Sequence, residues 1–262
     1  MRYAGLVEYD GAGFAGWAAQ PGRRTVENTL AGALATVLRQ PVRLTVAGRT
    51  DAGVHASGQV VSFEAETDLM PSSIFYGASA ILPEDLALKQ CVAARNGFDA
   101  RKDARSRSYE YWVLNDPIRS PLLRRRALHV AGALDPGLLK EAASLAKGTH
   151  DFRAFTPTKS HHIRFVRKVK HSSWETRAGL LVYTVTAESF LYGMVRTLVG
   201  TMLEVARSRR DLTDFEHLLS GGERKSAGPT VPAWGLTLID VGYEDLDFGE
   251  APQITPKRRS PK

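Results

Sequence analysis

Residues 42–66 read VRLTVAGRTDAGVHASGQVVSFEAE, and this stretch sets the organisation of the first part of the chain. Residues 42–47 and 59–66 carry β-branched side chains, which predicts two strands with a loop between them. Asp51 lies near the centre of that loop, with small residues before and after it. Small residues let a planar ligand come close to the backbone, so the loop is suited to present a carboxylate to a bulky substrate. The plainer alternative is an ordinary turn, in which Asp51 bonds its own backbone and Gly53 takes a positive φ.

Strands and helices alternate on both sides of this loop. Thr25 is a good N-cap residue, and apolar residues recur after it at helical spacing. The predicted order is strand-helix-strand-strand-helix-strand, which is the order of a ferredoxin-like fold. The elements are a strand over 2–10, a helix from Thr25, strands over 42–47 and 59–66, a helix from Pro71 to about Leu82, and a strand over 86–94.

The second part of the chain repeats this order without repeating the sequence. Asp135 and Pro136 predict a helix start, because a capping side chain precedes a residue whose φ already suits the first helical turn. The elements are a strand over 106–115, a helix from Asp135 to near Gly148, strands over 165–175 and 180–188, helices over about 190–208 and 211–220, and a strand over 235–243.

We therefore expect an α+β fold made of two ferredoxin-like, RRM-like halves whose antiparallel sheets form a central cleft. The first domain covers residues 1–104 and carries the Asp51 loop, and the second covers residues 105–245. Residues 246–262 form a basic tail that contains several prolines, and we expect it to be disordered.

The composition favours an anionic partner and a reducing compartment. The chain has 262 residues, of which 43% are apolar, and a formal net charge of +7. A basic balance of this kind favours binding to nucleic acid. The single cysteine, Cys91, rules out an internal disulfide, and its apolar surroundings predict a core position. Glu8 and Asp10 interrupt any secretory signal, and charged residues interrupt the longest apolar stretch, 190–206, so we expect a cytoplasmic protein without a membrane span.

The uninterrupted run AGRTDAGVHASGQV, residues 47–60, closely resembles the signature of the TruA family of tRNA pseudouridine synthases. Matches to the family's other motifs extend from about residue 3 to residue 243. They include Tyr9-Asp10-Gly11, Gly16-Trp17, Thr25-Val26-Glu27, Leu82-Pro83-Glu84-Asp85, Phe98-Asp99-Ala100-Arg101, Ser108-Tyr109-Glu110-Tyr111, Gly148-Thr149-His150-Asp151-Phe152, Met194-Val195-Arg196 and Gly228-Pro229-Thr230. The chain departs from the family's usual residues at Ala18, Ser79, Asp99, Gly193 and Thr197, which bears on secondary contacts to RNA rather than on the reaction.

The resemblance implies a homodimeric isomerase that converts uridine to pseudouridine in the anticodon arm of tRNA, at positions 38–40 in tRNA numbering. It implies that Asp51 is the nucleophile and that Arg196 is the cation beside it. It also places the ring of Tyr109 against the target base, with the hydroxyl assisting removal of the C5 proton. Arg49 is expected to help hold the extruded nucleotide, because an embedded base must leave its stack before it reacts.

The implied reaction is redox-neutral and consumes no water overall, so we expect no cofactor and no metal. The sequence agrees, because it has no dinucleotide-binding motif, no P-loop and no Cys/His cluster with zinc spacing. The expected partners are tRNA and a second copy of the chain.

Asp51 must stay ionised in a dry pocket, where burial raises a carboxyl pKa and a nearby cation lowers it. Arg196 is the candidate cation. Its helical neighbours Tyr192, Gly193 and Gly200 include small residues that leave room for another loop to reach the guanidinium. The alternative is that the glycines only admit a close helix or strand and that Arg196 extends into water.

Other interpretations stay open. A non-catalytic RRM-like RNA-binding protein or tRNA chaperone would use the same two halves without chemistry. His150 and Asp151 resemble the dyad of a metal-dependent phosphohydrolase, although a loop contact is the plainer role. His55 is four residues from Asp51, at a spacing where a metal pair is conceivable. His161-His162 is expected to be an exposed loop or an RNA contact.

Basic residues gather in several groups that would track a phosphate backbone if they flanked one cleft. For any single group the alternative is a solvated face. The groups are Arg101, Lys102, Arg105 and Arg107; Arg124, Arg125 and Arg126; Lys159 and Arg164; Arg167, Lys168 and Lys170; and Arg207, Arg209 and Arg210.

Overall fold

The computed structural model describes residues 1–158 and 163–249. The predicted order of elements in the first part of the chain is confirmed. Helix α1 begins at the predicted cap, where the Thr25 hydroxyl oxygen accepts a hydrogen bond from the Asn28 N–H at 3.3 Å. The elements are β1 (Arg2–Tyr9), the 3-10 helix η1 (Gly11–Gly13), α1 (Val26–Leu38), β2 (Thr45–Val46), β3 (His55–Glu64), α2 (Pro71–Ser79) and β4 (Leu86–Ala93).

The second part follows its predicted order with two short strands added, β6 and β7. The predicted cap is again present, because the Asp135 carboxylate accepts from the Gly137 N–H at 2.7 Å. The elements are β5 (Ser106–Asn115), η2 (Pro121–Leu123), β6 (Leu128–Val130), α3 (Pro136–Ala146), β7 (Gly148–Asp151), η3 (Phe152–Phe155), β8 (Val166–Arg177), β9 (Leu180–Ala187), α4 (Met194–Val205), α5 (Leu212–Leu219), η4 (Arg224–Ser226), η5 (Ala233–Gly235) and β10 (Leu236–Gly242).

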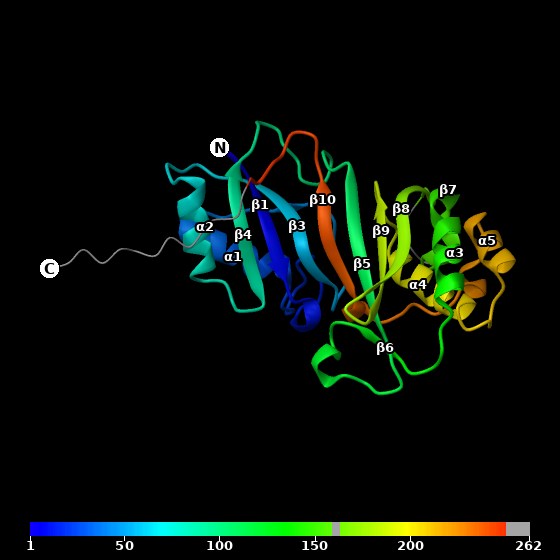
Figure 1. Ribbon diagram of the computed structural model, residues 1–262. Helices are drawn as coiled ribbons and strands as arrows, with labels where there is room; N and C mark the ends of the chain where they lie inside the picture. Colours follow the sequence, from blue (N-terminus) through cyan, green and yellow to red (C-terminus); the bar gives the residue numbers. More distant parts are fainter. Residues whose placement is uncertain (159–162, 250–262) are drawn as a thin grey trace.

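All the strands join one mixed sheet in the order β4-β1-β3-β10-β5-β9-β8-β7, with β2 on β3 and β6 on β5. Figure 1 shows this sheet running across the molecule, with α1 and α2 at one end and α3, α4 and α5 at the other. The expectation of one antiparallel sheet for each half is therefore wrong. The last strand returns to the centre, where it pairs parallel to β3 and antiparallel to β5.

The central strand β10 places two segments that are distant in sequence next to each other. Leu238 pairs with Ala56 on β3 and with Tyr109 on β5. Close approach of β10 to β3 requires a glycine, because a Cβ at Gly58 would lie 2.1 Å from the Ile239 carbonyl oxygen. The loop that precedes β3 and the Tyr109 side of β5 therefore meet in the middle of the sheet.

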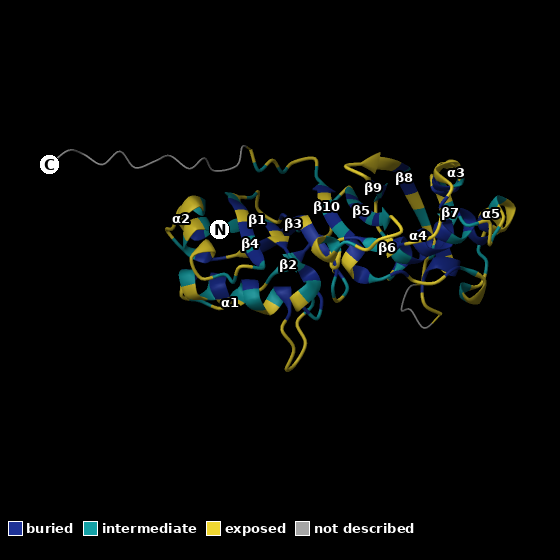
Figure 2. Cartoon of the chain, turned by 60° about the horizontal axis from the view of Figure 1, so that its bottom comes forward, coloured by how far each residue is buried: buried dark blue, intermediate teal, exposed yellow. Residues whose placement is uncertain are grey.

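Strands and helix α4 supply much of the core, whereas α1, α2, α3 and α5 keep exposed outer faces (Figure 2). Cys91 on β4 is buried, as predicted, and burial raises the pKa of its thiol to about 12. Within residues 1–158 and 163–249, none of the helices has the length and apolar character that a transmembrane span needs.

Two element boundaries differ from the prediction at glycines. Strand β3 begins at His55 rather than 59, so Gly58 lies inside it. Helix α4 begins at Met194 rather than about 190, because Gly193 has a φ of 69° and caps the helix in the left-handed region. Residues 190–193 therefore lie outside the helix, where they line a cavity.

The end of the described chain lies beside the edge strand β4. The Gln90 side-chain amide donates to the carbonyl oxygens of Phe248 and Gly249 at 3.1 and 3.3 Å. Residues 159–162 and 250–262 lie outside the described residues, and with them the predictions for Lys159, His161-His162 and most of the tail.

Candidate active site

A cavity of about 680 Å³ lies beside the Asp51 loop. Its volume falls in the range of pockets that hold small organic groups. We call residues 47–54 the acid wall and residues 188–196 the cation wall. Among the lining residues Asp51 is the one carboxylate, and it shares the cavity with four arginines. The polar and aromatic lining residues are Arg49, Thr50, Asp51, Arg101, Arg107, Tyr109, Ser189, Phe190, Tyr192 and Arg196.

The structure brings Asp51 and Arg196 together, although 145 positions separate them in the chain. The Arg196 Nη1 donates to Asp51 Oδ2 at 3.2 Å, and the two side chains are 19% and 21% exposed. Arg196 Nε also donates to the Val231 carbonyl oxygen at 2.8 Å. This second bond fixes the orientation of the guanidinium toward Asp51.

Opposing effects act on the ionisation of Asp51. Burial raises its pKa, whereas the charge of Arg196 and the hydrogen bond from it lower the pKa. Burial is the larger effect, so the pKa of Asp51 lies above its ordinary value. Arg196 therefore offsets only part of the cost of holding a carboxylate in this cavity.

Helix α4 approaches Asp51 because a neighbouring segment packs closely against it. A Cβ at Gly200 would lie 1.8 Å from the Pro229 carbonyl oxygen, so only glycine admits that segment. The Val231 N–H also donates to the Arg196 carbonyl oxygen at 3.3 Å. The glycine does admit a close neighbour, but the alternative that Arg196 extends into water is wrong.

Polar side chains outside the cavity hold the acid wall. The hydroxyls of Tyr9 and Thr50 are hydrogen-bonded at 2.8 Å, and the Gln59 amide donates to the Gly48 carbonyl oxygen at 2.7 Å. The Trp17 N–H donates to the Thr50 carbonyl oxygen at 3.0 Å. Gly16 has a φ of 94°, and a Cβ there would lie 3.0 Å from the same oxygen. The backbone around Asp51 is thus fixed from several directions.

Arg107 links the acid wall to the cation wall, and its side chain is buried. Its Nε and Nη2 both donate to the Ala47 carbonyl oxygen, at 3.2 and 2.7 Å. Its Nη1 donates to Ala104 O at 3.2 Å and Glu188 O at 2.6 Å, and Nη2 also donates to Arg101 O at 2.8 Å. All the N–H groups of the guanidinium are therefore used. The expectation that Arg107 belongs to a phosphate-tracking group is wrong for this reason.

Tyr109 lies on β5, lines the cavity and is 8% exposed. Its ring packs edge-on against Phe190 of the cation wall, with centroids 5.1 Å apart. Burial raises the pKa of Tyr109 well above its usual range, and the charge of Asp51 raises it further. The phenol therefore stays protonated at physiological pH.

Arg49 is exposed and lines the cavity. Within the described part of the chain, its guanidinium makes no hydrogen bond or ion pair. The four residues predicted from the sequence, Asp51, Arg196, Tyr109 and Arg49, therefore all line one cavity.

Comparison with known proteins identifies the family of this chain. The family model described as "tRNA pseudouridine synthase" matches residues 142–244. The tRNA pseudouridine synthase A of Pelobacter propionicus is 39% identical over 90% of this chain and 97% of its own length. Proteins of the same name from Geotalea uraniireducens and Burkholderia multivorans are 37% and 39% identical, over 91% and 93% of this chain and 98% and 90% of their own lengths. The chain belongs to the tRNA pseudouridine synthase A, or TruA, family. Members of this family are isomerases.

Membership of the TruA family does not by itself identify the residues that support the acid wall. Sequence reasoning missed Tyr9, Gln59 and the true role of Arg107. A signal was present for Arg107, because it has the same strand parity as Tyr109 and Tyr111, whose side chains are buried. A charged residue at an inward position of a strand points to a buried, hydrogen-bonded group.

The histidines considered as metal ligands have other partners. His55 is buried, and its Nε2 lies 2.8 Å from Arg125 O and 3.0 Å from Trp234 O, so Nε2 carries the proton. Its Nδ1 accepts from the Gly11 N–H at 3.0 Å, and burial lowers the pKa of the ring. His55 therefore joins three segments as a neutral side chain.

His150 and Asp151, the dyad considered for a phosphohydrolase, each have a different partner. His150 Nε2 is hydrogen-bonded to Lys147 O at 3.0 Å, and Asp151 forms an ion pair with Arg153 at 2.6 Å. Over residues 1–158 and 163–249, no group of three or more His, Cys, Asp or Glu side chains is placed to hold a metal ion.

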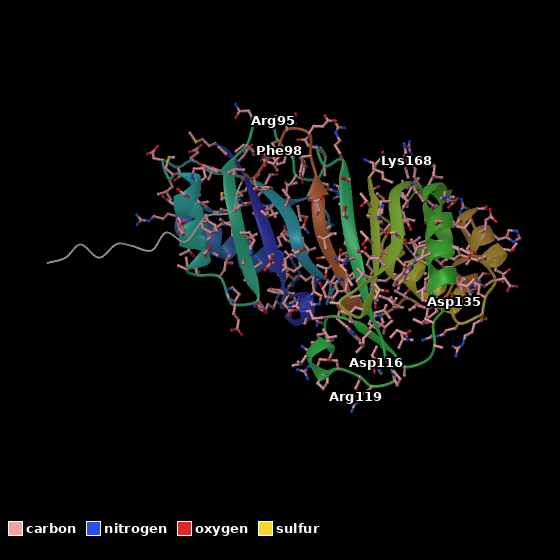
Figure 3. All side chains as sticks on the ribbon, in the orientation of Figure 1. Arg95, Phe98, Asp116, Arg119, Asp135 and Lys168 are labelled. Atoms are coloured by element: carbon pink, nitrogen blue, oxygen red, sulfur yellow. The ribbon has the colours of Figure 1, made fainter. Side chains whose placement is uncertain are left out.

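The basic groups do not all lie at one place. Lys168, on β8, and Arg119, in the loop before β6 that also carries Arg124–Arg126, lie at opposite ends of the strands (Figure 3). Arg101 differs from most of these residues, because it lines the cavity.

Proposed function

We propose that this TruA-family protein isomerises uridine to pseudouridine in the anticodon arm of tRNA, at positions 38–40. The observation that carries the proposal is the Asp51–Arg196 pair, 3.2 Å apart in a cavity of about 680 Å³. The pair combines a carboxylate with a fixed cation and an arginine-rich lining. Such a site suits a polyanionic substrate that inserts one planar base.

Asp51 acts in this proposal as the nucleophile at the breaking N-glycosidic bond. The carboxylate bonds to the ribose as the bond to N1 breaks, and the released uracil anion turns within the site. C5 then forms the new bond to the ribose as the carboxylate leaves, C5 gives up its proton, and N1 takes one up, so that the atoms of the uridine are conserved. Arg196 keeps Asp51 ionised until the substrate arrives, because its charge and hydrogen bond lower the Asp51 pKa. The reaction is redox-neutral, so these side chains need no cofactor.

Tyr109 and Arg49 act on the base and its backbone. The Tyr109 ring packs against Phe190 in the cavity lining, where it supports the inserted base. Its phenol is neutral, so it relays the C5 proton rather than holding a negative charge. Arg49 holds the extruded nucleotide, whose unstacking costs about a few kcal/mol.

The proposal extends to the assembly. Residues 1–104 and 105–245 act as two halves that share the one mixed sheet, and the cavity lining, which comes from both ranges, supports a central cleft between them. The enzyme works in the cytoplasm as a homodimer, which lets one tRNA contact both copies. A monomeric mass in solution together with full activity would overturn the dimer.

Asp51→Asn tests the proposed function. We expect the variant to form no pseudouridine on an unmodified tRNA transcript while its thermal midpoint stays near that of the wild type. Asp214→Asn, an exposed carboxylate on α5, is the matched control and should keep full activity. A tRNA chaperone or RNA-binding protein would instead show no pseudouridine with the wild type and unchanged tRNA binding with Asp51→Asn.

A further inference from the structure

The segment that orients Arg196 is irregular backbone. Residues 228–231, which we call the carbonyl segment, lie between the 3-10 helices η4 and η5. The Val231 carbonyl oxygen accepts from Arg196 Nε at 2.8 Å, and the Val231 N–H donates to the Arg196 carbonyl oxygen at 3.3 Å. Because a helix or sheet ladder does not fix the carbonyl segment, the direction of the guanidinium depends on the side chains that hold this segment.

Helix α4 supplies such a side chain. The Thr201 hydroxyl donates to the Thr197 carbonyl oxygen at 2.8 Å and accepts from the Gly228 N–H at 3.0 Å. The first bond fixes the direction of the hydroxyl, so that a lone pair remains for the N–H. A Cβ at Gly228 would lie 2.8 Å from the Thr201 Cα, so the two backbones leave no room for a bridging water.

A second bond reaches the carbonyl segment from the surface. The hydroxyls of Thr197 and Thr230 are hydrogen-bonded at 2.9 Å, and Arg224 Nη2 donates to Thr230 Oγ1 at 3.0 Å. Thr230 is exposed, so water can replace these bonds. Thr201 is fully buried, and loss of its hydroxyl would leave the buried Gly228 N–H without this acceptor. The position of the segment therefore depends more on Thr201 than on Thr230.

We propose that Thr201 is a positioning residue, which acts through the carbonyl segment to aim the Arg196 guanidinium at Asp51. The link begins at the Thr201 hydroxyl and runs along the segment to the Val231 carbonyl oxygen. It ends at the bond from Arg196 Nη1 to Asp51 Oδ2, at 3.2 Å. A small displacement of a charged group beside a reacting centre has a large effect on rate. The effect of Thr201 on catalysis rests on the proposed function, whereas its effect on the Asp51 carboxyl is a property of the free protein.

A set of variants separates this role from a general loss of stability. Thr201→Val removes the hydroxyl and keeps the branched shape, whereas Thr201→Ser keeps the hydroxyl. Ser172→Ala is the matched control, because it removes another buried hydroxyl, which is hydrogen-bonded to the Tyr183 hydroxyl at 2.9 Å. Neither Thr201 nor Ser172 is among the described residues that line the cavity. Thr201→Val and Ser172→Ala should both lower the thermal midpoint, because each loses a buried hydrogen bond.

The first experiment titrates the Asp51 carboxyl in the free protein by NMR of the carboxyl carbon, with Asp51→Asn identifying the signal. Arg196 lowers the pKa of Asp51 through its charge and hydrogen bond, so a guanidinium that is no longer aimed should lower the pKa less. We expect a higher Asp51 pKa in Thr201→Val and the wild-type pKa in Thr201→Ser and Ser172→Ala.

The same Asp51 pKa in Thr201→Val and in the wild type would overturn the proposal. Thr201→Ala replaces Thr201→Val if the valine variant does not fold, because the smaller side chain leaves room for water at the Gly228 N–H. Its Asp51 pKa should shift in the same direction, and an unchanged pKa would again overturn the proposal.

The second experiment measures pseudouridine formation on an unmodified tRNA transcript. Thr201→Val should lower kcat about tenfold and leave KM unchanged, because the residue moves a charge without lining the cavity. The acid limb of the pH profile should move to higher pH, and Thr201→Ser should restore both properties. In the Arg196→Met background, Thr201→Val should cause little further loss, because it acts through Arg196.

Fully additive losses in the double variant, or a change in KM alone, would overturn the positioning role. If the wild type forms no pseudouridine on this tRNA, the proposed function fails instead. The NMR titration of Asp51 still decides the role of Thr201 in that case, so the two failures are distinguishable.

Discussion

The acid wall and the cation wall face the same cavity, but different forces hold them. Polar side chains from outside the cavity bind the backbone of the acid wall, and they include Gln59 on Gly48 O and Tyr9 on Thr50. The cation wall combines apolar burial with a bond of the same kind, because the Thr156 hydroxyl donates to the Tyr192 carbonyl oxygen at 2.9 Å. Leu191 is 4% exposed and Met194 is fully buried. The wall with the carboxylate is thus positioned mainly by directional bonds, and the opposite wall by packing together with the bond from Thr156.

This difference follows from what each wall must do. A carboxylate with a raised pKa needs a fixed geometry, because a small displacement changes both its ionisation and its reach. A guanidinium has a long side chain and is always charged, so it tolerates a wall defined by shape. The Asp51–Arg196 pair and the Arg107 clamp bridge the two walls. Variants that remove one of these bridges test whether the bridge is needed to hold the two walls together. A variant that removes one bond of the acid wall tests how much a single bond contributes.

The largest effect is expected for Arg196→Met, which removes the bridge at the reacting group. Loss of a fixed charge beside the reacting centre should lower kcat about 100- to 1000-fold. The acid limb of the pH profile should also move. The proposed function requires ionised Asp51, whose pKa is already above the ordinary 3.8, and in the absence of Arg196 the pKa of Asp51 should rise further. Activity should therefore be lost at a higher pH as the medium is acidified.

Arg196→Lys is the control for this prediction, because it keeps the charge while changing the hydrogen-bond geometry. Its acid limb should lie between those of the wild type and Arg196→Met. An unchanged acid limb in Arg196→Met would show that Arg196 does not act on the ionisation of Asp51. A pH–rate profile of kcat/KM for the three proteins measures this.

A smaller effect on activity is expected for Arg107→Met. This variant removes the link between the two walls and leaves the Asp51 side chain unchanged. The carbonyls of Ala47 and Glu188 lose their donor, and we expect a loss of about 2–4 kcal/mol in the free energy of unfolding. Activity should fall even at temperatures where the variant is fully folded, because the acid wall is no longer fixed. Denaturant unfolding measures the loss of stability, and kcat at low temperature measures the loss of activity in the folded variant.

Arg105→Met serves as the comparison for Arg107→Met. Arg105 is two residues away, its side chain is 61% exposed, and its ion pair with Glu244 lies at the surface. An exposed pair contributes about 0–1 kcal/mol, so this variant should stay near the wild type. Equal losses of stability in both variants would contradict the clamp.

The sequence predicts the elements of this fold better than their assembly. Caps such as Thr25 and Asp135 act within a few residues, and the structure places both helices where these caps indicate. The position of β10 depends instead on pairing with strands that are far away in the chain. Periodicity carries no information about which neighbour a strand takes, so the mixed sheet was not predictable.

The candidate site divides in the same way. Asp51, Arg196, Tyr109 and Arg49 were found through motif resemblance, and all four line one cavity. The role of Arg107 was assigned from its charge alone, although carbonyls from three other segments decide it. The sequence shows which types of side chain the candidate site contains. Which of them are buried, and which backbone carbonyls accept hydrogen bonds from them, is known only from the structure.

The smallest effect is expected for Tyr9→Phe, which removes one bond from the acid wall. The hydroxyl of Tyr9 bonds Thr50, the residue before Asp51, at 2.8 Å. Its loss should cost about 0.5–1.5 kcal/mol in the free energy of unfolding and lower kcat a few-fold. Burial raises the pKa of Tyr9 to about 12, so the phenol stays neutral and the pH profile should keep its shape.

Tyr3→Phe is a matched control on the same strand. Tyr3 is also buried, but among the described residues the hydrogen-bond partner of its hydroxyl is the sulfur of Met1, at 3.6 Å. Weak bonds to sulfur contribute little, so stability and kcat should both stay near the wild type. If the two variants lose kcat equally, the bond to Thr50 has no part in placing Asp51. The acid wall would then be held by its other contacts. The difference between the two walls would in that case depend on the Arg107 clamp.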